Sequence, residues 1–133
     1  MTASIIYQGN LRNLCTHSAS STTLITDAPT DNQGQGASFS PTDLVATALA
    51  ACMLTIMGIK ANENQWNIVD TEVQITKIMG TDPRRIIEIK IDLFFKEKLD
   101  HKTMKILENC AKTCPVAYSL HPDINQNVKF HWL

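Results

Sequence analysis

Hydrophobic and polar positions alternate in short stretches near both ends of this chain and run together in its middle. Residues 3–8 (ASIIYQ) and 22–27 (TTLITD) are short β-type runs. The polar stretch between them, GNLRNLCTHSASS, predicts a turn or an irregular hairpin. Residues 28–39 carry proline, aspartate, asparagine and two glycines without periodicity, which is typical of a loop. The chain is therefore expected to open with a β-rich region that ends in a loop.

A helix start follows this loop. Ser40 is in place to be an N-cap, Pro41 stands at the first helical position, and Asp43 lies three residues after the cap. Serine and a carboxylate at this spacing come close to a capping box, and proline is favoured at the first helical position. The sequence therefore predicts that a helix begins at residue 41.

The helix predicted from this start is apolar nearly all round. Its sequence, LVATALAACMLTIMGIKA, has no polar face, so a helix of about 22 residues should be buried on every side. Ala46 with Ala50 gives it one small-residue face, and Ala48 with Ala51 gives another on the far side. In so short a chain, burial on every side requires a sheet on one side and a further layer, such as a second subunit, on the other.

The pattern then changes to period two. Residues 69–78 alternate, with Val69, Val73 and Ile75 on one face, and alternation resumes at residues 86–95 after a short turn. Two antiparallel strands, each with one polar face, are the structure that this pattern favours.

A second, amphipathic helix is predicted after these strands. Asp100 is its cap and residues 101–113 form its body. Lysines and a glutamate mark its polar side. Its apolar stripe is expected to comprise Met104, Ile106, Leu107 and Cys110.

The end of this helix is set by a proline. Pro115 disfavours helical geometry at Cys114, so the helix should end or kink there. Pro115 is also suited to open a short new helix, PVAYSL, and residues 127–133 predict a last strand.

Composition narrows the class of protein. A chain of 133 residues with 44% hydrophobic positions suits a single domain, residues 1–133. The net charge of -1, without runs of like charge, gives no reason to expect nucleic acid or an anionic membrane as a partner. The first residues lack the features of a secretory signal, and no window offers the roughly 20 apolar residues of a membrane span. We therefore expect a cytoplasmic protein that acts on a small molecule or another protein.

Four cysteines, at positions 15, 52, 110 and 114, are the candidates for chemistry. Paired structural disulfides are typical of secreted chains that are poor in core residues, which this chain is not. Neither the cysteine spacing nor the scattered histidines match a zinc site, so no metal or cofactor is expected. The plain alternative for each cysteine is a small buried hydrophobic residue.

The surroundings of the four cysteines differ. Cys52 lies in an apolar helix, where a thiolate needs a nearby arginine or lysine. Cys114 lies just before a helix start, where unpaired N–H groups and the helix dipole favour a thiolate. Cys110 falls on the apolar stripe and is interpreted as a core residue. Cys15, in a polar turn, is interpreted as structural or incidental.

Two of these cysteines lie in motifs of a known family. Residues 36–57 (GASFSPTDLVATALAACMLTIM) resemble the OsmC and organic-hydroperoxide-resistance superfamily, in which a long central helix opens with a proline after a glycine-rich loop and carries a cysteine about three turns in. Residues 111–120 (AKTCPVAYSL) look like its second-cysteine motif, and residues 82–100 are similar to the strand that crosses the helix in the less characterised OsmC-like branch. The resemblance covers nearly the whole chain, in the right order.

The resemblance implies an α+β, OsmC-like fold in which antiparallel sheets wrap around a long central helix and two chains intertwine into a homodimer with active sites at the interface. It implies a thiol-dependent peroxidase of oxidative-stress defence that reduces organic hydroperoxides, with hydrogen peroxide as another substrate. Carried onto this sequence, Cys52 would become a sulfenic acid and Cys114 would condense with it to a disulfide, which a small dithiol reductant would reopen.

The resemblance also implies a cation for the thiolate. In the family, an arginine in the N-terminal hairpin serves this role, and Arg12 is the arginine before the loop. The alternative for Arg12 is a solvated turn residue. The family's peroxidases hold this arginine with a glutamate directly after the proline, where this chain has Thr42. Asp43 is rotated about 100° from that position and is better interpreted as part of the helix cap. The change bears on efficient peroxidase activity, not on the fold.

Two other functions remain open on the sequence. One is a non-catalytic OsmC-like dimer whose interface pocket binds a small apolar or thiol-reactive ligand. The other is a dimeric scaffold with buried cysteines. Within the enzyme hypothesis, Cys110 remains the second candidate for the resolving thiol.

Overall fold

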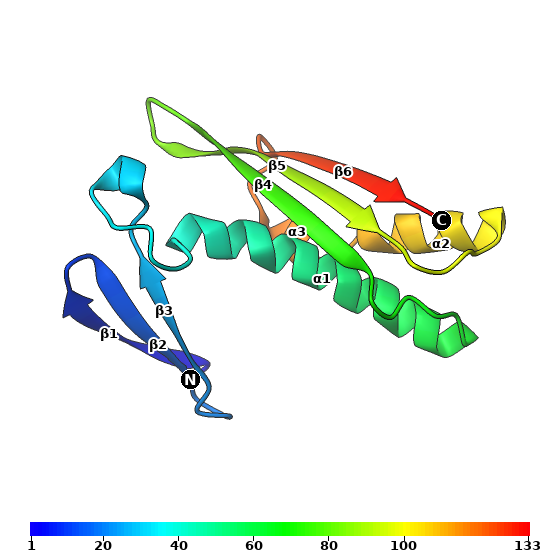
Figure 1. Ribbon diagram of the computed structural model, residues 1–133, viewed down its shortest axis with the longest axis horizontal. Coiled ribbons are helices and arrows are strands. Elements are labelled where there is room, and N and C mark those ends of the chain that lie inside the picture. The colour runs from blue at the N-terminus through cyan, green and yellow to red at the C-terminus, as the bar shows by residue number, and fades with distance from the viewer. The chain divides into compact units, whose positions relative to one another are not determined.

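The computed structural model describes all 133 residues, Met1 to Leu133. They form two compact units, Met1–Val45 and Ala46–Leu133, and the long helix α1 begins in the first and continues into the second (Figure 1). The elements in chain order are β1 (Ala3–Gly9), β2 (Arg12–His17), β3 (Thr23–Asp27), the 3-10 helix η1 (Thr30–Asn32), α1 (Pro41–Asn64), β4 (Glu72–Gly80), β5 (Arg85–Phe94), α2 (His101–Ala111), α3 (Pro115–Ser119) and β6 (Asn125–His131).

The first unit contains an antiparallel sheet with strand order β1-β2-β3. The polar stretch expected to be a turn or an irregular hairpin forms an antiparallel hairpin with β1, with a register shift between Tyr7 and Gly9. The hairpin is thus confirmed, but the sequence did not indicate the strand β2. Asn10 and Leu11, with φ of 54° and 64°, confine the turn to the two residues before it. Backbone pairing with β1 and β3 holds β2 in the sheet. Its polar side chains gave no strand pattern in the sequence.

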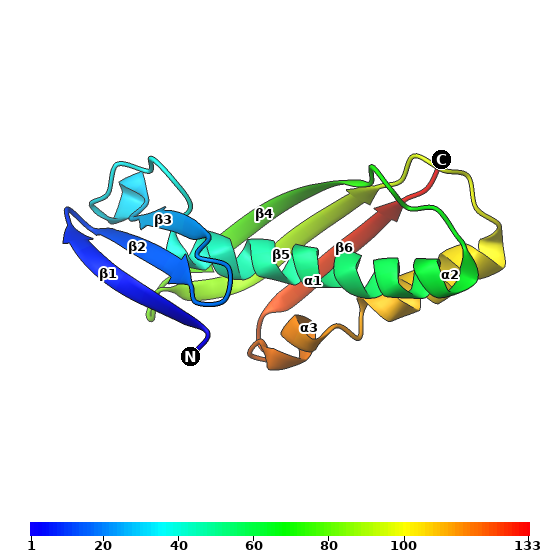
Figure 2. The ribbon, with the colours of Figure 1, turned by 90° about the horizontal axis from the view of Figure 1, so that it is seen from below.

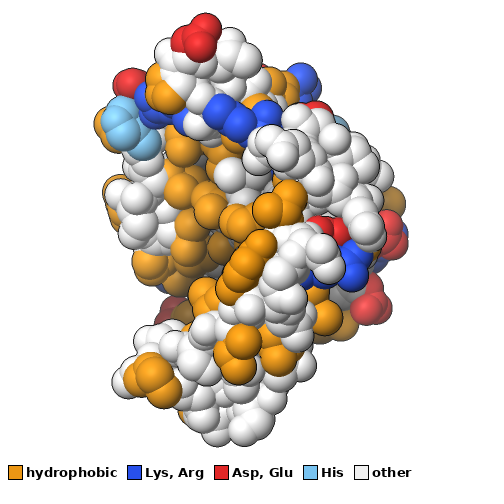
Figure 3. Space-filling view, turned by 90° about the vertical axis from the view of Figure 1, so that its left-hand side faces the viewer, with side chains coloured by type: hydrophobic (Ala, Val, Ile, Leu, Met, Phe, Trp, Pro, Cys, Tyr) orange, Lys and Arg blue, Asp and Glu red, His pale blue; other side chains and the backbone are white.

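Hydrophobic side chains of this sheet lie open to solvent. Figure 3 shows hydrophobic groups exposed at this end of the chain. Those of the sheet that stay more than 40% exposed are Ile5, Ile6, Tyr7, Leu24 and Ile25. A three-stranded sheet with so much uncovered apolar surface is typical of an interaction surface.

The predicted start of α1 is confirmed, including its cap. The Ser40 Oγ accepts from the Asp43 N–H at 3.1 Å, and the Asp43 Oδ2 accepts from the Ser40 N–H at 3.0 Å. This reciprocal pair is a capping box, which satisfies two backbone donors at the helix start. The helix runs for 24 residues from Pro41.

Burial of α1 on every side is not found within the single chain. The buried positions fall on one face and comprise Ala46, Leu49, Ala50, Met53, Met57 and Ala61. The opposite face carries Ala48, Ala51, Thr55 and Ile59, which are exposed. Of the two predicted small-residue faces, one therefore packs inside the unit and the other faces outward.

The second unit is built on a sheet with strand order β4-β5-β6. The predicted pair β4–β5 is antiparallel, but β6 pairs with β5 in parallel, which corrects the expectation of purely antiparallel sheets. The two helices between β5 and β6 supply the crossover that a parallel pair needs. Val69 lies before β4 and is 69% exposed, so it is not part of the strand face where the pattern placed it.

The core of this unit lies between its sheet and its helices. α1 and α2 lie on the same face of the sheet in both ribbon views (Figure 1 and Figure 2). Ile89, Ile91 and Leu93 of β5 are fully buried in one cluster with α1 residues such as Leu49 and Met53. The alternation of β5 thus places its hydrophobic face against the helices.

α2 begins as predicted, but its buried stripe is shifted. The Asp100 Oδ1 accepts from the Thr103 N–H at 2.8 Å, and these hydrogen bonds hold the pKa of the Asp100 carboxyl below its usual range. Among the four predicted stripe residues only Leu107 is fully buried; Met104, Ile106 and Cys110 are half-buried. The buried positions of the helix are Thr103, Leu107 and Ala111. Two small residues on this face let the helix approach the core closely.

By length and composition alone, α1 is long and apolar enough to cross a membrane, contrary to the sequence-based expectation. Core helices of soluble proteins pass the same test. In this chain the buried face of α1 packs in the core of the second unit.

Candidate functional site

Cys52 and Cys114 meet in the second unit. Cys52 lies in α1 and Cys114 directly precedes α3, and the two thiols are near enough for Cys52 to raise the pKa of Cys114. Both are free thiols. The structure therefore brings together two cysteines that are 62 residues apart in the sequence.

The position of Cys114 follows from the local sequence. Pro115 opens α3 as predicted, and Cys114 is its N-cap in an extended conformation. Its Sγ accepts from the Ala117 N–H at 3.3 Å, and its carbonyl oxygen accepts from the Tyr118 N–H at 3.2 Å. The cap fixes both the backbone and the sulfur of this residue.

The net electrostatic effect at Cys114 differs from the expectation of a stabilised thiolate. Burial raises the pKa of the Cys114 thiol above its ordinary value, and the adjacent Cys52 raises the pKa further. The N–H groups of Ala117 and Val116 act in the opposite direction, but they do not offset these effects. Cys114 therefore keeps its proton at neutral pH.

The two thiols are unequal in their access to solvent. The Cys114 residue is fully buried, whereas Cys52 is only partly buried and packs against the edge of the core. A reagent from solution thus meets Cys52 first. Cys114 is placed to react only with a sulfur that is already beside it.

The other cysteines lie elsewhere. Cys15 is half-buried in β2, in the first unit, opposite Ile5 and Leu24. Cys110 is half-buried on α2 and lies outside the buried core cluster, so its interpretation as a core residue was wrong. Because α2 turns its Thr103–Leu107–Ala111 face inward, Cys110 falls at the edge of that face.

Arg12 occupies a defined cluster in the first unit. It begins β2 and is the cross-strand partner of Asp27 at the end of β3. Its Nη2 donates to the Gln35 Oε1 at 2.8 Å and lies 3.5 Å from the Asp27 Oδ2. The Arg12 side chain is 37% exposed, whereas the Asp27 side chain is fully buried. Arg12 is thus not a solvated turn residue.

The sequence analysis missed Asp27 and Gln35. Their connection to Arg12 depends on a β2–β3 register that could not be predicted without the strand β2. A signal was nevertheless present, because Asp27 lies two residues before Pro29, where the strand ends and the loop begins.

The residues after the helix-opening proline play local roles. The Thr42 Oγ1 lies 3.2 Å from the Ser40 Oγ, and the Asp43 carboxylate is engaged with the Ser40 N–H. The interpretation of Asp43 as part of the cap is confirmed.

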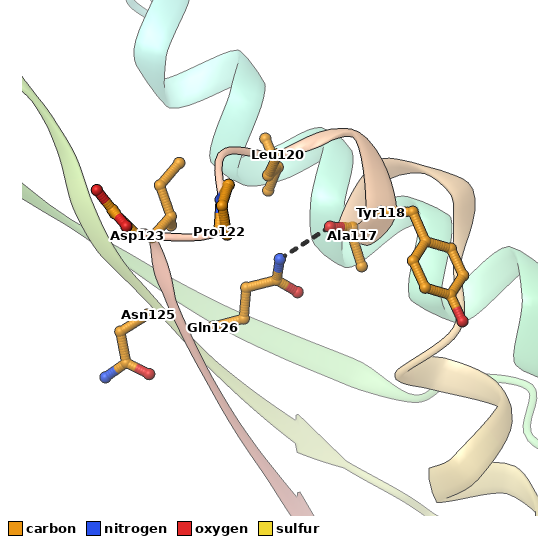
Figure 4. A pocket seen from close by; sticks show the side chains of 8 residues that line it. Ala117, Tyr118, Leu120, Pro122, Asp123, Asn125 and Gln126 are labelled. Atoms are coloured by element: carbon orange, nitrogen blue, oxygen red, sulfur yellow. Dashed lines mark hydrogen bonds between the residues drawn. The ribbon is translucent and has the colours of Figure 1, made fainter.

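A hollow of about 760 Å³ lies beside α3. It is lined by residues of α3, of the turn after it and of the start of β6, and the Gln126 side chain donates to the Ala117 carbonyl across it at 3.1 Å (Figure 4). Tyr118 stands at its side, 74% exposed. The hollow is open, so it offers a surface for a small molecule near the helix that Cys114 caps.

No group of three or more His, Cys, Asp or Glu side chains in the chain is arranged to hold a metal ion.

Comparisons with known proteins agree on the family. The model of the OsmC family, described as OsmC-like protein, matches residues 34–129. The crystal structure of a protein described as an osmotic stress induced and detoxification response protein, from Psychrobacter arcticus 273-4, is 53% identical, with a TM-score of 0.96 over 98% of this chain and 96% of that one. No curated protein matches the chain.

More distant structures share the fold. The organic hydroperoxide resistance protein OsmC of Legionella pneumophila is 16% identical, with a TM-score of 0.76 over 97% of this chain and 94% of that one. The organic hydroperoxide resistance protein OhrB of Bacillus subtilis is 19% identical, with a TM-score of 0.68 over 98% of each chain. With the family model covering most of its length and a relative 53% identical, this chain belongs to the OsmC-like protein family.

Proposed function

We propose that this protein is a thiol-dependent peroxidase that reduces organic hydroperoxides through Cys52 and Cys114. The observation that carries the proposal is the unequal pair of thiols: a partly exposed Cys52 beside a buried, protonated Cys114. A two-cysteine peroxidase needs one sulfur that a peroxide can reach and a second that waits for the first to be oxidised.

The proposed reaction has three steps. The Cys52 thiolate attacks one peroxide oxygen, the O–O bond breaks, and an alcohol leaves after taking up a proton, so Cys52 becomes a sulfenic acid. The Cys114 sulfur then attacks the Cys52 sulfur, an S–S bond forms, and the sulfenic oxygen leaves as water. A small dithiol reductant exchanges with this disulfide, is itself oxidised to a disulfide and restores both thiols.

The structure supports this division of roles. A sulfenic acid on Cys52 would form next to a neighbouring thiol, which favours condensation over further oxidation. The raised pKa of Cys114 keeps it protonated until that step, so it does not compete for the peroxide. Cys114 is favoured over Cys110 as the resolving thiol because Cys52 packs against the core cluster that holds Cys114 and raises the pKa of Cys114, whereas Cys110 lies outside that cluster.

We further propose Arg12 as the cation that stabilises the Cys52 thiolate. A guanidinium stays charged at any physiological pH, and that of Arg12 is partly exposed and held by two side chains. Solved structures with the same fold are named organic hydroperoxide resistance proteins, which agrees with an organic hydroperoxide as the proposed substrate.

The proposed working form is a cytoplasmic homodimer. The exposed hydrophobic side chains of β1 and β3 and the outward face of α1 support this assembly. Analytical ultracentrifugation at several protein concentrations should give twice the monomer mass.

A second candidate function is binding without turnover. The open hollow beside α3 favours it, because a small apolar or thiol-reactive ligand could lodge there next to the helix capped by Cys114. Steady-state consumption of cumene hydroperoxide in the presence of dithiothreitol separates the two functions. The peroxidase predicts turnover that Cys52→Ser abolishes and Cys15→Ser leaves unchanged. Stoichiometric binding without turnover would support the second function instead.

A further inference from the structure

Beside Arg12 lies a carboxylate, that of Asp27, which takes no part in the proposed reaction steps. Asp27 lies at the end of β3, directly across the strand pair from Arg12. Its side chain is fully buried, and its Oδ2 accepts from the Ala37 N–H at 2.9 Å. Its Oδ1 is buried without a hydrogen-bond partner.

A buried carboxylate of this kind needs a compensating charge. Desolvation penalises an ionised group unless a counter-ion and hydrogen bonds replace the lost water. Arg12, 3.5 Å from Oδ2, supplies positive charge beside it. The unpartnered Oδ1 leaves Asp27 able to accept a second guanidinium N–H, which is the two-pronged geometry that arginine and carboxylate prefer.

The loop after β3 completes the cluster from the other side. The Asp27 N–H donates to the Phe39 carbonyl at 3.0 Å, which closes the loop on itself. Within it, a Cβ at Gly34 would overlap the Ala28 carbonyl, so only glycine allows this close approach. The approach brings the next residue, Gln35, back to Arg12.

The start of α1 offers one carboxylate, Asp43, which belongs to the helix cap. Thr42 has no carboxylate, and the Asp43 carboxylate is engaged with the Ser40 N–H in the capping box. Asp27 is therefore the acidic side chain that the first unit places against the guanidinium.

We propose that Asp27 is the positioning residue for Arg12, with Gln35 as a neutral second anchor. Asp27 holds the guanidinium through its charge, and Gln35 holds it through a hydrogen bond. Because one N–H goes to a neutral amide and Asp27 binds loosely, the guanidinium keeps donors for an anionic partner. This inference rests on the proposed function, in which that partner is the Cys52 thiolate.

Asp27 could instead serve only to anchor the loop through Ala37. The variant Asp27→Asn separates these roles, because asparagine keeps an oxygen for the Ala37 N–H and loses only the charge. The double variant Asp27→Asn with Gln35→Glu returns a carboxylate to Arg12 from the other anchor. Rescue by this second change is expected of a positioning role and not of a loop anchor.

Two readouts are needed. The first is kcat/KM for cumene hydroperoxide, together with the pH profile of Cys52 alkylation by iodoacetamide. Asp27→Asn should lower kcat/KM by about tenfold to a hundredfold, as expected when a charged group is misdirected, and should move the alkylation profile to higher pH. The double variant should recover most of both changes. An unchanged kcat/KM in Asp27→Asn, or no recovery in the double variant, would overturn the proposal.

The second readout does not depend on activity. NMR of the guanidinium N–H groups, with Arg12 distinguished from Arg84 and Arg85 by substitution, reports whether the group rotates freely. Asp27→Asn should free the Arg12 guanidinium, and Gln35→Glu added to it should restrain the group again. If Asp27→Asn fails to fold, Gln35→Ala provides the test: Asp27 alone should keep Arg12 restrained, and a freely rotating guanidinium would refute the assignment.

The two proposals fail separately. If the wild-type protein does not turn over peroxide, the proposed function is wrong, and the NMR measurement still decides whether Asp27 holds Arg12. If the wild type is active and Asp27→Asn has the same kcat/KM, the positioning role of Asp27 is wrong and the proposed function stands.

Discussion

Cys52 of α1 raises the pKa of the Cys114 thiol, although Cys114 lies 62 residues further along the chain, at the N-cap of α3. The pair is asymmetric, because Cys114 is fully buried and Cys52 is not. Burial keeps the pKa of Cys114 high, so its proton is available to the neighbouring sulfur. An accessible thiol beside a protected one is the arrangement on which the proposed chemistry depends.

The raised pKa of Cys114 predicts a pH dependence of stability. Its thiol is protonated in the folded protein at pH values where an unfolded cysteine, with a pKa of about 8.5, already loses its proton. Above about pH 8.5 the unfolded state therefore binds fewer protons than the folded state, and the unfolding free energy falls as pH rises. Below that pH the contribution of the Cys114 thiol to the unfolding free energy is fully present.

Cys114→Ser should flatten this decline. Urea unfolding between pH 7 and pH 10 measures it, and the wild-type slope should exceed the variant's by at most about 1.4 kcal/mol per pH unit, the limit for one proton. Cys15→Ser, in the first unit, is the matched control for the loss of a thiol. Equal slopes in wild type and Cys114→Ser would contradict the assigned direction of the pKa.

Two glycines, Gly34 in the loop that carries Gln35 and Gly58 in α1, predict opposite effects of alanine substitution. Gly34→Ala should destabilise the protein, because its Cβ would overlap the Ala28 carbonyl and the loop would have to move. Gly58→Ala should stabilise it by up to about 1 kcal/mol, because a Cβ there meets nothing and alanine favours the helix. Thermal unfolding of both variants checks this pair. A Gly34→Ala variant as stable as wild type would show that the loop is not built as described.

The capping box predicts a modest, local cost. Ser40→Ala removes the acceptor for the Asp43 N–H and should lower the unfolding free energy by about 1 kcal/mol. Ser4→Ala, on an exposed strand, is the control and should change it by less than about 0.5 kcal/mol. Urea titration resolves the difference, and equal effects of the two changes would argue against the cap.

Differences in burial along β5 predict a large difference between two of its isoleucines, one in the core and one at the register shift of the strand. Ile89 is fully buried, so Ile89→Ala should cost about 2–5 kcal/mol through lost burial and a cavity. Ile87 is 44% exposed, and Ile87→Ala should cost clearly less. Similar losses for both in urea unfolding would contradict this difference in burial between Ile87 and Ile89.

Local signals in the sequence predicted much of this fold. The capping box, the apolar run of α1, the alternation of β5 and the proline before α3 each act over a few residues, so each could be interpreted without the rest of the chain. The family resemblance rested on the same segments, and the family is confirmed.

What could not be predicted depends on contacts between distant segments. β2 is polar, and only pairing on both sides makes it a strand. The parallel pairing of β6 depends on the crossover through α2 and α3. For the same reason Asp27 escaped notice: its partner Arg12 is defined by the strand register, not by spacing along the chain.

The sequence also predicted more burial of α1 than one chain provides. The apolar run predicted a helix covered on all sides, but Ala48, Ala51, Thr55 and Ile59 are exposed in the single chain. The pattern of a sequence reports the total burial of a helix and not which chain supplies it. The proposed homodimer would resolve the difference.

The most direct test of the central claim is the intact mass and thiol count of the reduced protein before and after one equivalent of cumene hydroperoxide. Wild type should lose two hydrogens and two thiols through a disulfide that peptide mapping assigns to Cys52 and Cys114. Cys114→Ser should stop at a sulfenic acid, with one oxygen gained, and Cys52→Ser should not react. Survival of all four thiols in the wild type, or a disulfide that maps to other cysteines, would contradict the account.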